Sequence, residues 1–199
     1  MTYTTNTRFS KQFILLGLGL LLFAGAFAQT KYSSKNGISI EVNGTSTLHD
    51  WEMKSADGSF DANFTQTATG AITAVNGMSF TTNPKALKSG KSAMDNNAYK
   101  ALKTDKAPSI SFIANTSTVT AVDATTYIVK ATGKLSIAGA VKDTEISAKC
   151  KVNADKTISV TGERKISMKD FSREPPSFMM GTIKTGNDVT IKFDLKLSK

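Results

Sequence analysis

The segment Val189–Ser198, VTIKFDLKLS, sets the fold class of this chain. Apolar residues stand at every second position from Val189 to Leu197, and polar residues stand between them. Neighbouring side chains of a β-strand point to opposite faces, so this pattern predicts a strand with one face in a core and the other in water. Shorter alternation recurs at Ile38–Val42, Met78–Phe80, Leu135–Ile137, Ile146–Val152, Ile158–Val160 and Ile166–Met168.

Turn signals separate these segments. Pairs such as Asn43-Gly44, Asp57-Gly58 and Asn76-Gly77 favour tight reversals of the chain. Eight or more short strands with half-apolar faces need one enclosed interior, and a closed antiparallel barrel provides it without exposed edges. A two-sheet sandwich gives the same alternation, so periodicity alone leaves both architectures open.

One region, from Asn83 to Pro108, has no strand pattern. Here Ser92 is predicted to cap a short helix, and Asp95 three residues later supplies the acidic half of a capping box. Pro108 ends the helix, and the alternating residues Ile110–Ala114 then predict a strand. We therefore expect one short helical insertion between strands.

Residues 1–28 have the features of a secretory signal peptide. Arg8 and Lys11 form a positively charged start, residues 13–23 are apolar, and a small-x-small cleavage site ends at Ala28. A retained N-terminal anchor is the alternative, although the apolar run is shorter than the ~18 residues of a membrane-spanning helix. We expect cleavage near Ala28 and a periplasmic or secreted protein.

The remaining residues, 29–199, fit one domain with one core. Loss of Arg8 and Lys11 lowers the formal charge from +9 to +7. The lysines lie on polar strand faces among acidic residues, which argues against a nucleic-acid partner and leaves a loose association with an anionic membrane surface as a weaker expectation. The sequence patterns predict no particular oligomeric state.

The chain has few residues suited to catalysis or metal binding. Cys150 is the only cysteine and follows the inward alternation of its strand, so we expect a buried core residue. His49 is the only histidine, and its neighbour Asp50 points to the opposite face of an extended chain. One His and one Cys do not make a zinc site. We predict no catalytic residue, metal or cofactor; a lipid hydrolase or isomerase with His49 as general base is the alternative.

Phenylalanine and methionine dominate the large apolar residues. The chain has 11 Phe and 7 Met against 4 Tyr and 1 Trp. These side chains lack strong hydrogen-bonding groups, and Met adapts to irregular shapes, so together they suit either a packed core or the lining around a flexible hydrocarbon. Phe178 and Met180 follow two prolines outside clear alternation, as the lip of a pocket would.

Several motifs in a fixed order resemble the YceI-like family of small secreted bacterial proteins, in the shorter form of Bacteroidetes-type bacteria. They are Gly44–Trp51 (GTSTLHDW), Lys106–Phe112 (KAPSISF), Gly133–Lys142 (GKLSIAGAVK), Met168–Phe171 (MKDF) and Pro175–Gly181 (PPSFMMG). Each motif alone is weak, but their order over most of the chain is specific.

The resemblance implies an all-β fold, a single eight-stranded antiparallel lipocalin-like barrel with one short helical insertion. It also implies a non-enzymatic role in which the barrel holds a long apolar lipid such as a polyisoprenoid. A barrel filled by its own side chains, acting as an envelope or stress protein without a ligand, is the alternative. We expect Phe178 and Met180 to line the entrance and Phe112 and Phe193 to lie deeper. The full set of predicted ligand-binding residues is Trp51, Phe80, Phe112, Phe178, Met180 and Phe193.

Overall fold

The computed structural model describes residues 1–2, 28–34 and 36–199. Within them the chain forms twelve strands, one α-helix and two short 3₁₀ helices. In chain order these are β1 (Ala28–Ser34), β2 (Ile38–Ser46), β3 (Trp51–Ser55), β4 (Ser59–Gln66), β5 (Ile72–Thr82), η1 (Pro84–Ala86), α1 (Ser92–Ala101), β6 (Ile110–Ala114), β7 (Ser117–Ala121), β8 (Thr126–Ile137), β9 (Ala140–Val152), β10 (Ile158–Ser167), η2 (Met168–Phe171), β11 (Ser177–Phe178) and β12 (Ile183–Leu197).

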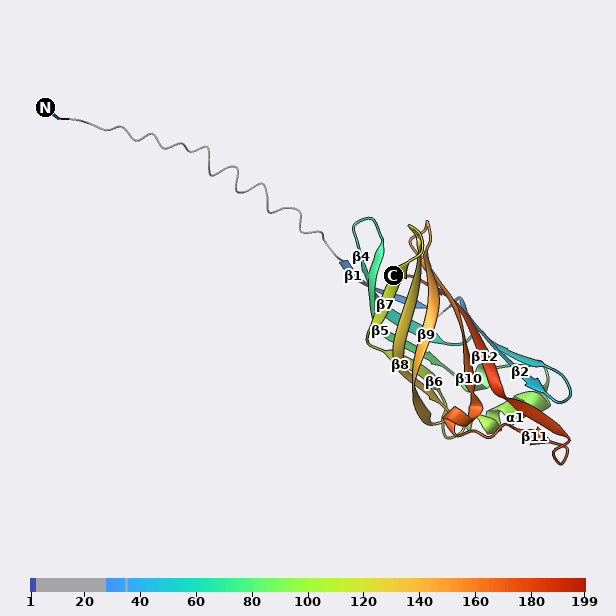
Figure 1. Cartoon of the computed structure of the whole chain (residues 1–199). Coiled ribbons are helices and arrows are strands. Elements are labelled where there is room, and N and C mark those ends of the chain that lie inside the picture. The colour runs from blue at the N-terminus through green and yellow to red at the C-terminus, as the bar shows by residue number, and fades with distance from the viewer. Residues whose placement is uncertain (3–27, 35) are drawn as a thin grey trace.

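The strands form one curled antiparallel sheet, which we call the barrel (Figure 1). Its order is β1-β4-β5-β6-β8-β9-β10-β12-β2-β3, with β7 attached to β8 and β11 attached to β12. The predicted all-β lipocalin-like fold is confirmed. The strand count differs from the predicted eight, because β1 and β3 extend the two ends of the main ladder, and β7 and β11 pair beside it with β8 and β12. The end strands β1 and β3 do not pair with each other in the described structure, so the sheet forms a half-barrel and not the expected closed barrel.

The alternation of β12 decides which of its faces is buried. Val189, Leu195 and Leu197 are buried, whereas Lys192 and Lys196 are exposed. Each fully buried Leu or Val side chain stabilises the fold by about 1.5–3 kcal/mol. At the β1–β4 end of the core, Tyr32 and Phe64 pack edge to face, with ring centroids 5.2 Å apart.

The helical insertion has the predicted place but not the predicted cap. Ser92 is the first residue of α1, and the residue before it, Lys91, makes no side-chain capping bond. The Asp95 carboxylate instead accepts from the backbone N–H of Ser89 at 2.8 Å and from its hydroxyl at 2.6 Å. These bonds lower the pKa of Asp95. The carboxylate therefore fixes the loop before the helix, since Ser89 offers two donors.

Two pairs of backbone bonds tie the ends of the sheet to other segments. Ser33 and Ser198 exchange N–H···O bonds of 2.8 and 2.9 Å, so the first strand meets the end of the last. Lys54, on the edge strand β3, exchanges two 2.8 Å bonds with Lys88 in the loop before α1. In Figure 1, α1 and β11 lie toward one end of the barrel and β1 toward the other.

The predicted signal peptide lies almost wholly outside the residues that the structure describes, and β1 begins at Ala28. No helix within the described part of the chain has the length and apolar character needed to cross a membrane.

Candidate functional site

The interior of the barrel contains an apolar cavity of about 160 Å³. Eight consecutive strands of the described sheet, from β4 through β12 to β2, contribute side chains to it. All but two of the lining residues that the structure describes are apolar. The exceptions are Thr82, whose hydroxyl donates to the Asp57 carbonyl at 2.8 Å, and Arg164.

Three of the predicted ligand-binding residues line this cavity: Phe80, Phe112 and Phe193. Phe80 and Phe112 face each other as cross-strand partners of β5 and β6. Phe193 lies on β12, which is several strands away from β5 and β6 in the sheet order. Their place follows from the two-residue period of their strands, which turns each ring to the inner face.

The other three predicted residues do not line the cavity. Trp51 lies on the edge strand β3, where its ring covers Gly44 and its indole N–H donates to the Thr45 carbonyl at 3.0 Å. Phe178 belongs to the two-residue strand β11, which pairs only with β12 in the described structure. Met180 is fully exposed in the hairpin that follows. A role of these residues in ligand entry stays a prediction.

Met78, whose alternation with Phe80 was recognised in the sequence, also lines the cavity. Sequence reasoning did not single out Arg164, which lines it as well. Arg164 was recognisable only by counting inward positions along β10, from Ile158 through Val160.

Strands β9 and β10 are paired over only part of their length. The two strands pair from Val152 opposite Ile158 to Ala148 opposite Gly162. Beyond Gly162, β10 pairs with β12 alone among the described strands, as far as Ser167. The β9-facing edge of residues 163–167 is therefore without a strand partner in this part of the structure.

Gly162 stands at the point of divergence, where no side chain fits. A Cβ atom at this position would lie 2.5 Å from Cζ of Phe193 and 2.7 Å from the carbonyl oxygen of Ser147. Real Cβ atoms do not approach other atoms so closely, so the glycine allows the Phe193 ring to lie against the sheet.

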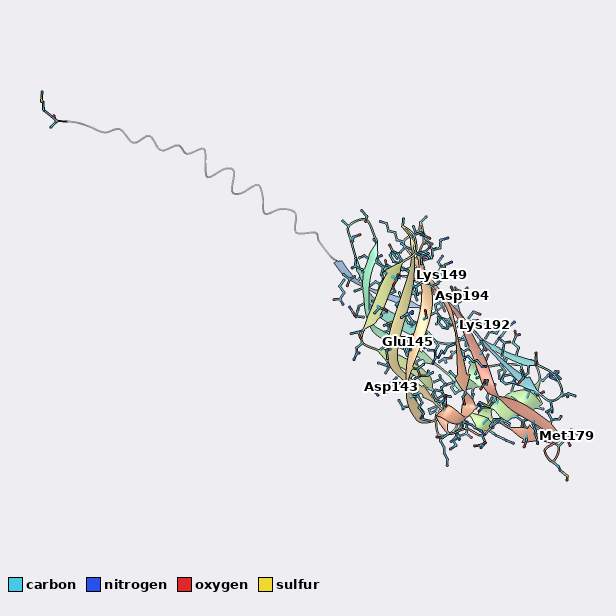
Figure 2. All side chains as sticks on the ribbon, in the orientation of Figure 1. Asp143, Glu145, Lys149, Met179, Lys192 and Asp194 are labelled. Carbon is cyan, nitrogen blue, oxygen red and sulfur yellow. The ribbon has the colours of Figure 1, made fainter. Side chains whose placement is uncertain are left out.

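A groove of about 560 Å³ lies on the outer face of β9, β10, β12 and β2 at the same place. Its rim is polar and charged, and Figure 2 labels three of the side chains on this face, Lys149, Lys192 and Asp194. The groove and the inner cavity have Ala148 and Phe193 in common. The cavity and the groove thus approach each other at these two side chains.

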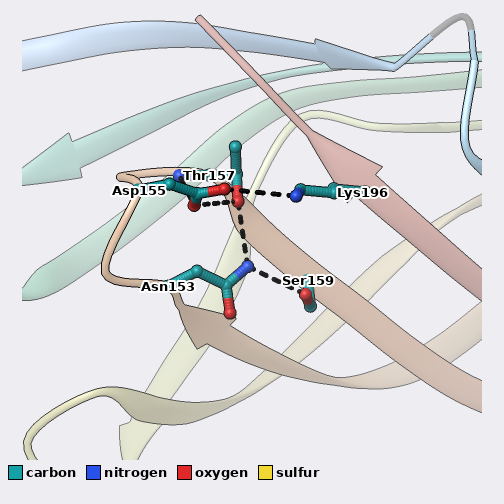
Figure 3. A network of polar contacts seen from close by, with 5 residues as sticks. All are labelled: Asn153, Asp155, Thr157, Ser159 and Lys196. Carbon is teal, nitrogen blue, oxygen red and sulfur yellow. Dashed lines mark hydrogen bonds and ion pairs between the residues drawn. The ribbon is translucent and has the colours of Figure 1, made fainter.

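The opposite end of the β9–β10 hairpin is held by polar contacts (Figure 3). The Asp155 carboxylate accepts from the Thr157 hydroxyl at 2.5 Å and its N–H at 3.0 Å, and Lys196 of β12 lies 3.2 Å from its other oxygen. The Asn153 amide donates to Thr157 and to Ser159. The bonds from Thr157 and, to a lesser extent, the contact with Lys196 lower the pKa of Asp155 to about 2. Polar contacts therefore hold the hairpin together at its turn, whereas its two strands are no longer paired beyond Gly162.

The residues with reactive side chains lie in unreactive surroundings. His49 is exposed in the bend before β3, and its Nδ1 contacts the backbone carbonyl of Asp50 at 2.7 Å. Ser46 hydrogen-bonds the backbone of His49 and not its ring. Cys150 is 3% exposed, as predicted, and burial raises the pKa of its thiol to about 12. A protonated thiol is a poor nucleophile.

Two solved structures share this fold over nearly their whole length. Burkholderia cenocepacia BcnA superposes with a TM-score of 0.63 at 15% identity, covering 81% of this chain and 96% of that one. A polyisoprenoid binding domain from Saccharophagus degradans, implicated in plant cell wall breakdown, also gives 0.63 at 10% identity, covering 84% and 97%. A search of curated proteins returned no match.

A family model described as the YceI-like domain matches residues 24–197 of the sequence. The match spans most of the chain and includes every strand that lines the cavity. It agrees with the curled antiparallel sheet, the single helical insertion and the apolar interior. This chain therefore belongs to the YceI-like family.

Proposed function

We propose that this protein is a non-enzymatic carrier that holds the hydrocarbon chain of a long lipid, such as a polyisoprenoid, inside the barrel. One observation carries the proposal: eight strands converge on a cavity whose lining is apolar except at Thr82 and Arg164. Burial of a hydrocarbon there is favourable at roughly 25 cal/mol per Å² of apolar surface. The polyisoprenoid binding described for the Saccharophagus degradans domain of the same fold supports this ligand class.

The size of the cavity limits how a ligand fits. Apolar cavities of about 150 Å³ accept a molecule as small as benzene, whereas pockets for larger ligands measure about 300–1,000 Å³. The 160 Å³ interior thus takes one end of a long chain. We propose that the rest follows when the Phe193 ring swings away from Gly162, which joins the cavity to the outer groove.

The small volume also favours the second candidate, a barrel filled by its own side chains that acts without a ligand. In that case the aromatic and methionine side chains form an ordinary core, and Phe193 has no reason to move.

We further propose that the protein is exported and works in the periplasm or outside the cell, with the N-terminal segment as its signal peptide. Catalysis is not part of the proposal, because the His49 ring is exposed and the Cys150 thiol is buried and protonated.

Native mass spectrometry of the protein purified from a bacterial envelope tests the proposal. We expect a bound mass that organic extraction releases as a long-chain lipid. Ala148→Phe fills the junction between cavity and groove and should abolish the bound mass. Lys151→Phe adds the same ring to the outer face of β9, outside both the cavity and the groove, and should retain it. Wild-type protein without lipid, which also fails to take up a polyprenol, would favour the side-chain-filled barrel.

A further inference from the structure

Among the described residues that line the apolar cavity, Arg164 has the only charged side chain. It follows Val160 and Gly162 at every second position of β10, so all three lie on the inner face. Its cross-strand partner is Ile191, which also lines the cavity. Arg164 therefore adds a positive charge at the edge of an otherwise apolar lining.

No acidic side chain of the described structure neutralises Arg164. The ion pairs found there use lysines throughout, and the neighbouring Lys165, on the outer face, contacts Asp188 at 2.8 Å. The acidic neighbour Glu163 alternates to the outer face and lines the groove. Arg164 is exposed to water, so its charge remains solvated while its five N–H donors stay available.

Arg164 lies where the head group of an amphiphile would be if its hydrocarbon tail occupied the cavity. It lies two residues beyond Gly162, in the part of β10 that has left β9 and faces water. Ile191, its partner on β12, and Ile146, on the separated strand β9, also line the cavity. A lipid whose chain occupies the cavity would place a head group at this opening, where ions keep most of their hydration and are not penalised by burial.

We propose that Arg164 receives the anionic head group, a phosphate or a carboxylate, of a long-chain lipid whose tail lies in the cavity. The guanidinium presents paired N–H groups that match two oxygens of either anion, a geometry that lysine lacks. This inference rests on the proposed carrier function and adds to it a preference among lipids of equal length.

Delipidated protein tests the inference with four probes: geranylgeranyl phosphate, geranylgeraniol, palmitate and hexadecanol. We expect wild type to bind each anion about 10-fold to 100-fold more tightly than the alcohol of the same chain, a preference that falls with added salt. A preference in only one pair would identify phosphate or carboxylate as the recognised head.

Arg164→Gln should remove the preference, so that each anion binds no more tightly than the alcohol of the same chain, and Arg164→Lys should retain a part of it. Lys165→Gln is the matched control, since it removes the same charge from the outer face of the adjacent position. An undiminished preference in Arg164→Gln, or none in wild type, would overturn the role of Arg164 while alcohol binding still supports the carrier. Absence of binding to all four probes would overturn the carrier function as well.

Discussion

The ring of Phe193 lies across the backbone of Gly162, its cross-strand partner on β10. Aromatic residues opposite a glycine compensate for the packing that the glycine lacks. Here the pair stands where β9 leaves the sheet, so one ring both completes the core and separates the cavity from the outer groove.

Gly162→Ala should destabilise the protein. The new Cβ would meet Cζ of Phe193 at 2.5 Å and the Ser147 carbonyl at 2.7 Å, so both the ring and the backbone must shift. We expect a loss of about 1–3 kcal/mol in the free energy of unfolding, measured by urea denaturation. Thr161→Ala, on the outer face beside it, should change stability by less than about 0.5 kcal/mol. Equal losses of unfolding free energy in the two variants would mean that the close approach of Gly162 to Phe193 does not affect stability.

Phe112→Asp and Met180→Asp should differ in their effect on stability. Phe112 is 7% exposed in the core, where an unpaired carboxylate costs about 4 kcal/mol or more. Met180 is fully exposed, so the same substitution there should change stability by less than about 0.5 kcal/mol. Thermal melts of the two variants compare them, and lipid uptake by folded Met180→Asp tests the predicted entrance. A melting temperature lowered equally in both would place Met180 in the core.

Met180→Gly should stabilise the protein. Met179 and Met180 both have positive φ angles, 50° and 56°, although side chains with a Cβ disfavour this region. Glycine relieves that strain, and we expect a gain of about 1 kcal/mol in urea denaturation. Met180→Ala removes the same exposed side chain but keeps the Cβ, so its stability should equal that of wild type. A comparable gain in both variants would instead attribute the effect to loss of the exposed methionine.

The Cys150 thiol should make the folded state more sensitive to alkali. Its pKa rises from 9.0 to about 12 on folding, so the unfolded chain loses this proton first. Stability therefore falls as the pH rises from 9 toward 12. In Cys150→Ala the free energy of unfolding should fall less steeply over that range, whatever its value at neutral pH. Parallel curves for the two proteins would contradict the shift.

The contacts with Thr157 should lower the pKa of Asp155 more than the ion pair with Lys196 does. Its pKa of about 2 lies below the ordinary 3.8, and the hydroxyl of Thr157 is the largest cause. The stabilisation is thus complete above pH 3.8 and is lost as the pH falls toward 2. NMR titration of the carboxyl should find a larger rise in pKa for Thr157→Val than for Lys196→Gln. The reverse order would make the ion pair to Lys196 the dominant contact.

Local periodicity predicted the parts of the structure that depend on a single strand. The alternation around Phe193 on β12 and around Cys150 on β9 gave the correct buried faces, because neighbours in one strand share a fixed geometry. Phe80 and Phe112 were placed in the interior for the same reason.

Features that depend on pairing between distant strands were not predictable in this way. The sequence of β10 shows an inward position at Arg164 but not that β9 has left the sheet there. Trp51 alternates like a core residue, yet its strand is an edge of the sheet. Asp95 has the spacing of a capping box, but Ser89 competes for it with two donors.

The bonds between Ser33 and Ser198 bear on how the chain folds. β12 is the last strand to be synthesised, and it pairs with β10, β2 and β11. Strand β2, near the start of the chain, must therefore wait for Leu195 and its neighbours before it finds a partner on that side. Contacts between such distant segments form slowly, since a long loop must close first. We therefore expect the barrel to assemble only after its last strand has been synthesised, with β2 left unpaired on that side until then.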